Sequence, residues 1–157
     1  KTRYPQYALN NFLPRKAMLE AVLILNIIWF LMGFNVFSIR NKIFAKLLVP
    51  KEHRDTPVFE ILAESGRFLG GFNFAFAVSN ILLLINLDVF PSDPQRSILL
   101  FVFAVAHGSQ FVFNVQPWMQ NKKGRGAWQV KGTMLFIFVT DFLMMLLNLA
   151  LAAQYIF

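Results

Sequence analysis

Three polar side chains share one face of an otherwise apolar segment. In FAVAHGSQFVFN, His107, Gln110 and Asn114 stand at positions i, i+3 and i+7, which places them on one side of an α-helix. An imidazole can ligate a haem or another pigment, or transfer a proton, and the carboxamides can donate and accept hydrogen bonds. The alternative is that all three side chains only hydrogen-bond to neighbouring helices.

Polar pairs occur in three further apolar segments. They are Asn26 and Asn35, Asn73 and Asn80, and Asp141 and Asn148. The second and third pairs are seven residues apart, so each pair shares a helix face. Because polar groups that face lipid are costly, we expect these faces to point inward and to form a common polar seam.

Asp141 carries the group that is most costly to bury. An ionised carboxylate inside a membrane must be paired or protonated. Its two candidate partners are His107 and Arg67, whose expected depths are compatible with a contact. Two interpretations stay open: a proton- or ligand-binding site, and a buried network that only fixes helix register, of which the second is favoured.

The segments that must position these side chains are long and hydrophobic. Of the 157 residues, 57% are hydrophobic and 19 are phenylalanine, which is too much apolar surface for a soluble domain of this size. A membrane-spanning helix needs about 20 mostly apolar residues. Residues 17–39, 68–87, 97–115 and 133–155 qualify. The sequence therefore predicts an all-α integral membrane protein, a single domain folded as an up-down bundle of four helices.

The connector 40–66 differs from the two others. Ile43, Phe44, Leu47 and Leu48 fall on one helical face. This pattern predicts a short amphipathic helix in the headgroup layer, between the first and second spans. The alternative is a cytoplasmic extension of the first span.

Basic residues predict the orientation in the membrane. With four spans, the side that holds both termini carries Lys1, Arg3, Arg15, Lys16 and Arg96. The opposite side carries Arg40, Lys42, Lys46, Lys51, Arg54, Arg67, Lys122, Lys123, Arg125 and Lys131. The positive-inside rule then places loops 40–66 and 116–132 in the cytoplasm and both termini on the extracytoplasmic or lumenal side. This topology accounts for the net charge of +7 without a nucleic-acid partner.

Enzyme motifs are absent from the sequence. It contains no cysteine and no HExxH, GxSxG or P-loop motif, and a single span histidine excludes bis-histidine haem. We therefore expect no catalysis. Gly66 and Gly70 form a GxxxG motif that allows close helix approach, and the basic loop NKKGRG can contact anionic lipid headgroups.

Three sequence elements follow one another in a characteristic order. LPRKAMLEAVLILN opens the first span, SGRFLGG the second, and FAVAHGSQFVF lies in the third. This order resembles the ergosterol biosynthesis protein 28 family of small four-span membrane proteins, over roughly Leu13 to Val115. GFNFAFA replaces the family's aromatic-threonine element, and Gln110 replaces an acidic residue. The resemblance implies a non-catalytic scaffold that tethers membrane enzymes of lipid synthesis.

Two functions follow as expectations. The first is an accessory or scaffold subunit whose partners are other integral membrane proteins and membrane lipids. The alternative is a bundle that binds a small hydrophobic ligand, a cofactor, an ion or a proton, with pigment or haem held by His107. Its candidate residues are His107, Gln110, Asn114, Asp141, Asn148, Asn73, Asn80 and Arg67.

Overall fold

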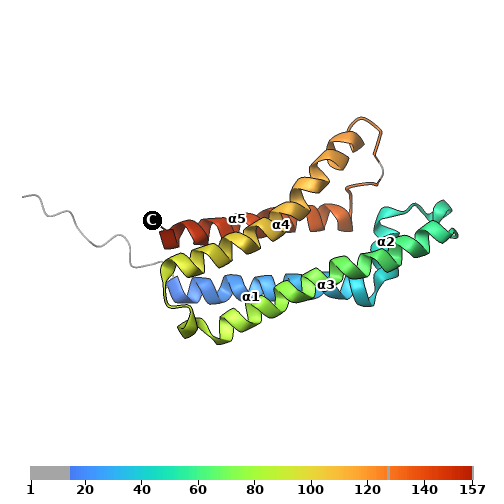
Figure 1. Ribbon diagram of the computed structural model, residues 1–157. Helices are drawn as coiled ribbons and strands as arrows, with labels where there is room; N and C mark the ends of the chain where they lie inside the picture. The colour runs from blue at the N-terminus through green and yellow to red at the C-terminus, as the bar shows by residue number, and fades with distance from the viewer. Residues whose placement is uncertain (1–14, 127, 157) are drawn as a thin grey trace, which may run out of the picture.

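Four long helices make up most of the protein (Figure 1). The structure is a computed structural model that describes residues 15–126 and 128–156. The helices are α1 (Arg15–Phe34), which continues as the π-helical segment Asn35–Ile39, α3 (Pro57–Ile85), α4 (Asp93–Asn121) and α5 (Thr133–Ile156). Each is long and apolar enough to cross a membrane, and no strand occurs in the described ranges. The chain is therefore an all-α, multi-pass membrane protein, as predicted.

Helices α3 and α4 begin before the apolar spans that were predicted from residues 68 and 97. Thr56 caps α3, because its hydroxyl accepts a hydrogen bond from the backbone of Phe59 at 3.4 Å, and Pro57 occupies the first turn. Ser92 and Gln95 form a reciprocal capping box at the start of α4. These caps, rather than hydropathy, determine where both helices start.

The connector between α1 and α3 contains the expected short helix, α2 (Asn41–Leu48). It is separate from α1, because Arg40 leaves the helical conformation at φ −106° and ψ 44°. A short 3-10 turn, Lys51–His53, follows it. Ala45 packs with Phe59 and Ala63 of α3. The buried face therefore centres on Ala45 rather than on Ile43, which is 41% exposed.

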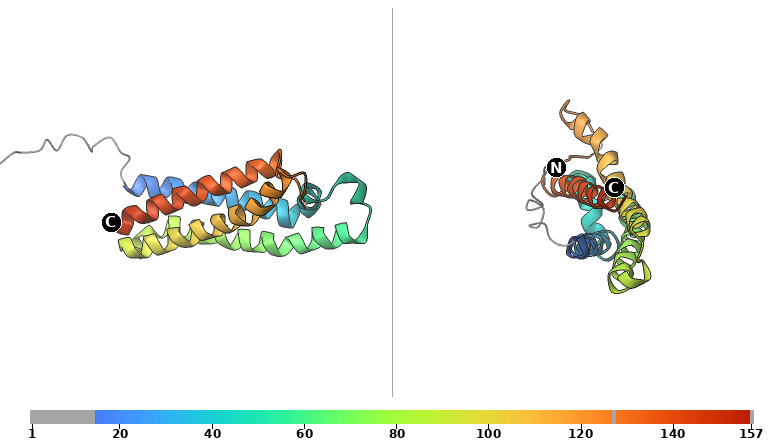
Figure 2. Two further views of the ribbon diagram at one scale, coloured as in Figure 1. Left: turned by 90° about the horizontal axis from the view of Figure 1, so that it is seen from above. Right: turned by 90° about the vertical axis from the view of Figure 1, so that its left-hand side faces the viewer.

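The helices associate in two pairs, α1 with α3 and α4 with α5, which contact each other mainly where α1 meets α5. We call the end with the α3–α4 turn and the end of α5 the terminal end, and the end with α2 the loop end. The 3-10 turn Leu87–Val89 lies at the terminal end. Figure 2 shows the long helices aligned along a common axis. Toward the loop end, the end of α4 and the start of α3 diverge (Figure 1).

The apolar core lies toward the terminal end. Its buried residues include Leu19, Leu23, Ala77, Leu100, Phe103 and Leu151. These side chains come from all four long helices, so the two pairs are tightly packed there. The divergence of the pairs is confined to the loop half of the bundle.

Glycines allow the closest approach between α3 and the end of the first span. A Cβ on Gly70 would overlap the side chain of Ser38, and one on Gly66 would lie 2.5 Å from Phe44 Cδ1. The Ser38 hydroxyl donates to the backbone carbonyl of Arg67 at 3.0 Å. The predicted GxxxG motif is thus the surface on which the π-helical segment and α2 pack.

Candidate functional site

Asn26 of α1 lies at the centre of a buried polar network. Its Nδ2 donates to Asn80 Oδ1 on α3 and to Asn148 Oδ1 on α5, both at 3.0 Å. Its Oδ1 accepts from Asn148 Nδ2 at 2.9 Å and lies 3.2 Å from His107 Nε2 on α4. One side chain of α1 therefore contacts all three other long helices, and all four residues are fully buried.

Backbone carbonyls fix the orientation of these amides. Asn80 and Asn148 each donate from Nδ2 to a carbonyl one turn earlier in the same helix, at 2.8 and 2.9 Å. Their Oδ1 atoms therefore face Asn26, which must turn its Nδ2 toward them and its Oδ1 toward His107. Because Oδ1 only accepts, His107 Nε2 must carry a hydrogen.

The other side of the imidazole contacts Asp141. His107 Nδ1 lies 3.2 Å from Asp141 Oδ1, and Trp29 Nε1 donates to the same oxygen at 2.8 Å. With Nε2 protonated, two lone pairs would face each other unless a second proton lies between Nδ1 and Oδ1. That proton belongs either to an imidazolium or to a carboxylic acid, and in both cases the His107–Asp141 pair is neutral overall.

The pair is held in a well-packed environment. The His107 ring stacks on Phe30 with a centroid distance of 4.6 Å and an interplanar angle of 16°. Within residues 15–126 and 128–156, no fully buried side-chain nitrogen or oxygen lacks a hydrogen-bond partner. The desolvation cost of the polar groups is therefore offset by hydrogen bonds throughout the network.

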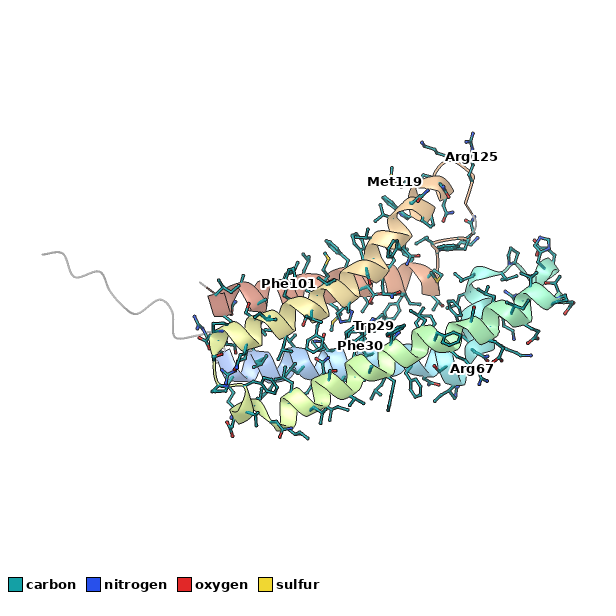
Figure 3. All side chains as sticks on the ribbon, viewed as in Figure 1. Trp29, Phe30, Arg67, Phe101, Met119 and Arg125 are labelled. Carbon is teal, nitrogen blue, oxygen red and sulfur yellow. The ribbon has the colours of Figure 1, made fainter. Side chains whose placement is uncertain are left out.

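A cavity of about 560 Å³ adjoins the network where the two helix pairs diverge. Trp29 and Asp141 belong to its wall. Figure 3 shows Trp29 and Phe30 at the position where α1 faces the α4–α5 pair. The apolar part of the wall includes Phe72, Phe76, Phe101, Val105, Phe136 and Ile137. The cavity therefore combines hydrophobic sides with a few polar atoms.

The remaining predicted site residues lie outside the network. Asn73 and Gln110 line the cavity, and the Asn73 amide donates to the carbonyl of Leu69 in its own helix at 2.9 Å. Asn114 accepts a hydrogen bond from Trp128 Nε1 at 3.3 Å and so contacts the loop after α4. The polar stripes thus separate with distance from the terminal end.

Arg67 does not contact Asp141, although the sequence allowed this contact. Its Nε lies 3.0 Å from Glu64 Oε2, one turn away on the exposed surface of α3. Figure 3 places Arg67 near α2, away from Trp29. A charged guanidinium is better stabilised by water and an adjacent carboxylate than by a buried partner, so α3 carries Arg67 beyond the cavity.

Two residues of the network were not among the predicted site residues. Asn26 and Asn35 were expected to face inward together although they are nine positions apart, and the structure buries Asn26 but leaves Asn35 exposed. Trp29 has one polar atom on a large apolar ring, so its residue type did not indicate a polar contact. Its position three residues after Asn26, on the same helix face, was the signal that could have identified it.

The geometry disfavours haem or pigment ligation through His107. Both ring nitrogens are engaged, by Asn26 and by Asp141, and the ring is completely buried. A haem iron could bind the imidazole only by displacing Asn26 or Asp141 from one ring nitrogen. In the described part of the chain, no three His, Asp or Glu residues are grouped as metal ligands.

Comparison with known proteins gives no relative. No family model, no curated protein and no solved structure matches this chain. The function must therefore be inferred from the geometry of the network and of the cavity.

Proposed function

We propose that this membrane protein binds a small hydrophobic molecule in the cavity between the α1–α3 pair and the α4–α5 pair. The observation that carries the proposal is a partly open cavity of about 560 Å³ with apolar walls and convergent polar atoms from Asp141 and Trp29. Binding sites for small molecules commonly have this size and composition. Binding without turnover is the expected activity, because Asn26 and Asp141 engage both ring nitrogens of His107.

The ligand enters from the hydrocarbon layer. Phe72 of α3 and Phe101 of α4 belong to the cavity wall and are 67% and 55% exposed. Both helices are apolar membrane-spanning segments, so this opening faces lipid tails. A hydrophobic ligand would cross no aqueous layer on its way to the cavity.

The test is to identify and displace the bound molecule. The protein is purified in a mild detergent, extracted with organic solvent, and the extract is compared by mass spectrometry with an equal amount of Val105→Trp protein. Val105 lies in the cavity wall, so the larger side chain fills part of the volume and a co-purifying molecule should be lost. Ile98→Trp is the matched control, because Ile98 lies on the same helix, is 65% exposed and does not belong to the cavity wall. Identical extracts from all three proteins would contradict the proposal.

A second candidate function is an accessory or scaffold subunit that holds other integral membrane proteins. It is supported by the folded lobe that α2 and the start of α3 form at the loop end. Lys42 Nζ lies 2.8 Å from Glu60 Oε1, and the Asn41 amide donates to Glu64 Oε1 at 2.9 Å, so charged and polar bonds fix α2 on α3. The resemblance to a family of membrane scaffolds points the same way. Stoichiometric membrane proteins recovered in a native pull-down would support this function.

The proposed orientation follows from the basic residues. Loops 40–66 and 116–132 would lie in the cytoplasm, and both termini on the extracytoplasmic or lumenal side. The lobe formed by α2 and the start of α3 would then be available to cytoplasmic portions of partner proteins and to anionic lipids.

A further inference from the structure

All hydrogen bonds to the Asp141 carboxyl group end on one of its two oxygens. Trp29 Nε1 and His107 Nδ1 lie 2.8 and 3.2 Å from Oδ1, whereas no group of residues 15–126 and 128–156 bonds to Oδ2. The side chain is only 4% exposed, yet no side-chain nitrogen or oxygen of this part of the chain is both fully buried and unpartnered. Oδ2 therefore keeps accessible surface, and Asp141 is a wall residue of the cavity.

We propose that Asp141 Oδ2 is the acceptor for the ligand's polar group, and that the ligand is an aliphatic molecule with one neutral hydroxyl. This inference rests on the proposed ligand-binding function and deepens it. It assigns the class of ligand and the atom that recognises it.

The protons of the network leave Asp141 Oδ2 without a hydrogen, so the ligand must donate the hydrogen bond to it. If the shared proton is on His107 Nδ1, Asp141 is a carboxylate and Oδ2 is an acceptor. If the proton is on Oδ1, Oδ2 is the carbonyl oxygen of the acid and again an acceptor. In neither state does Oδ2 carry a hydrogen, so only a donor group satisfies it.

The charge of the network favours a hydroxyl over an ammonium group. The His107–Asp141 pair is neutral overall, and Asp141 is the one ionisable side chain among the described residues of the cavity wall. An ammonium group there would be a buried charge without a counterion. To balance it, the shared proton would have to leave, and the Nδ1 lone pair would then face the carboxylate at 3.2 Å.

Other polar groups of the wall are less suited to this role. The Ser109 hydroxyl donates to the carbonyl of Ala106 at 2.8 Å, and the Asn73 amide donates within α3. Asp141, by contrast, is held by bonds from α1 and α4 that aim its second oxygen at the cavity. A preorganised acceptor of this kind discriminates between ligands with and without a donor.

The experiment compares three probes that share one chain: 1-dodecanol, dodecyl methyl ether and dodecylamine. The protein is reconstituted in phosphatidylcholine nanodiscs, with Trp118→Phe and Trp128→Phe leaving Trp29 as the only tryptophan. Trp29 emission reports on binding, because its indole bonds to the same carboxyl group. We expect saturable binding of the alcohol about tenfold tighter than of the ether, the loss expected for one hydrogen bond to this group. Equilibrium dialysis of the unsubstituted protein repeats the comparison without any variant.

Asp141→Asn provides the second arm. The new Nδ2 in place of Oδ2 donates instead of accepting, so the preference for the alcohol should disappear and the ether oxygen should become a partner. A preference that survives this substitution would assign the hydroxyl to another group, such as Gln110, and overturn the proposal. Tighter binding of the amine than of the alcohol would also overturn it.

The two proposals fail in different ways. If the alcohol and the ether bind equally and Val105→Trp weakens both, the cavity is a ligand site and the Asp141 anchor is wrong. If no probe binds saturably, or Val105→Trp changes nothing, the proposed function itself fails and the anchor fails with it.

Discussion

Asn26 and Asn148 form a reciprocal amide pair in which each side chain donates to the carbonyl oxygen of the other, at 3.0 and 2.9 Å. This pair joins α1 to α5, the two helices through which the helix pairs mainly touch. Because Asn26 also contacts Asn80 and His107, the same side chain connects α1 to each of the other long helices. The network therefore joins the two helix pairs by direct hydrogen bonds.

Substitution Asn26→Leu should destabilise the fold. It removes four hydrogen bonds worth on average about 0.6 kcal/mol each in a membrane, so the free energy of unfolding should fall by about 2 kcal/mol. Unfolding in mixed micelles measures the change. Asn35→Leu is the control, because Asn35 lies on the same span and is exposed. Equal stability of the two variants would contradict a central role for Asn26.

The protonation of His107 is a second prediction. Nitrogen NMR of protein labelled at histidine should show Nε2 bonded to hydrogen, because the oxygen it faces cannot donate. The variant His53→Asn removes the other histidine and leaves a single ring to observe. A spectrum with an unprotonated Nε2 would require a flipped Asn26 amide and would invalidate the proton count of the network.

The close contact at Gly70 provides a third prediction. Gly70→Ala inserts a methyl group into the Ser38 side chain, and overpacking of this kind should destabilise the protein by about 1–3 kcal/mol. Gly71→Ala is the matched control, since no atom lies within 4 Å of its added Cβ. It should raise the stability of α3 by up to about 1 kcal/mol through helix propensity. The reverse order in a thermal unfolding assay would refute the contact.

Asn121 organises the loop that follows α4. Its Nδ2 donates to the carbonyls of Arg125 and Trp128 at 3.1 and 3.0 Å, and its Oδ1 accepts from the backbone of Val130 at 2.7 Å. Asn121→Ala should therefore accelerate hydrogen exchange of the Val130 amide. Lys123→Ala, an exposed neighbour, should leave the exchange rate unchanged. An unchanged rate in the Asn121 variant would show that the loop is held by other contacts.

The predicted orientation can be tested with single cysteines, because the chain has none of its own. Lys51→Cys lies after α2, and Asp88→Cys lies in the α3–α4 turn; both positions are exposed. In intact cells or sealed vesicles of known polarity, a membrane-impermeant maleimide should label only the position 88 variant from the extracytoplasmic side. Labelling of the position 51 variant from that side would reverse the assignment.

Residue spacing predicted most of the inward-facing polar residues, but Asn35, which was expected to face inward with Asn26, is exposed. Asn80, His107, Asp141 and Asn148 were expected to face the bundle interior, and all four are buried there. The reason is the strong cost of polar groups toward lipid, which leaves a helix with one polar face little choice of rotation.

The spacing of polar residues in the sequence could not predict how far along the bundle the polar helix faces stay in contact. Asn73, Gln110 and Asn114 belong to the same stripes, yet they lie where the helix pairs have diverged. The divergence depends on the tilt of whole helices, which no local pattern determines. Likewise, Trp29 became a partner of Asp141 only through the packing of α1 against α5. The starts of α3 and α4, by contrast, could have been predicted from the capping residues Thr56–Pro57 and Ser92–Gln95. The hydropathy pattern alone placed both starts too late in the sequence.

The polar network and the cavity occupy successive levels between the same two helix pairs. The pairs touch mainly at α1 and α5 and diverge beyond this contact. The network therefore lies where the divergence begins, and the diverging ends carry α2 and the loop after α4. The volume of the cavity therefore depends on the angle at which the two helix pairs diverge.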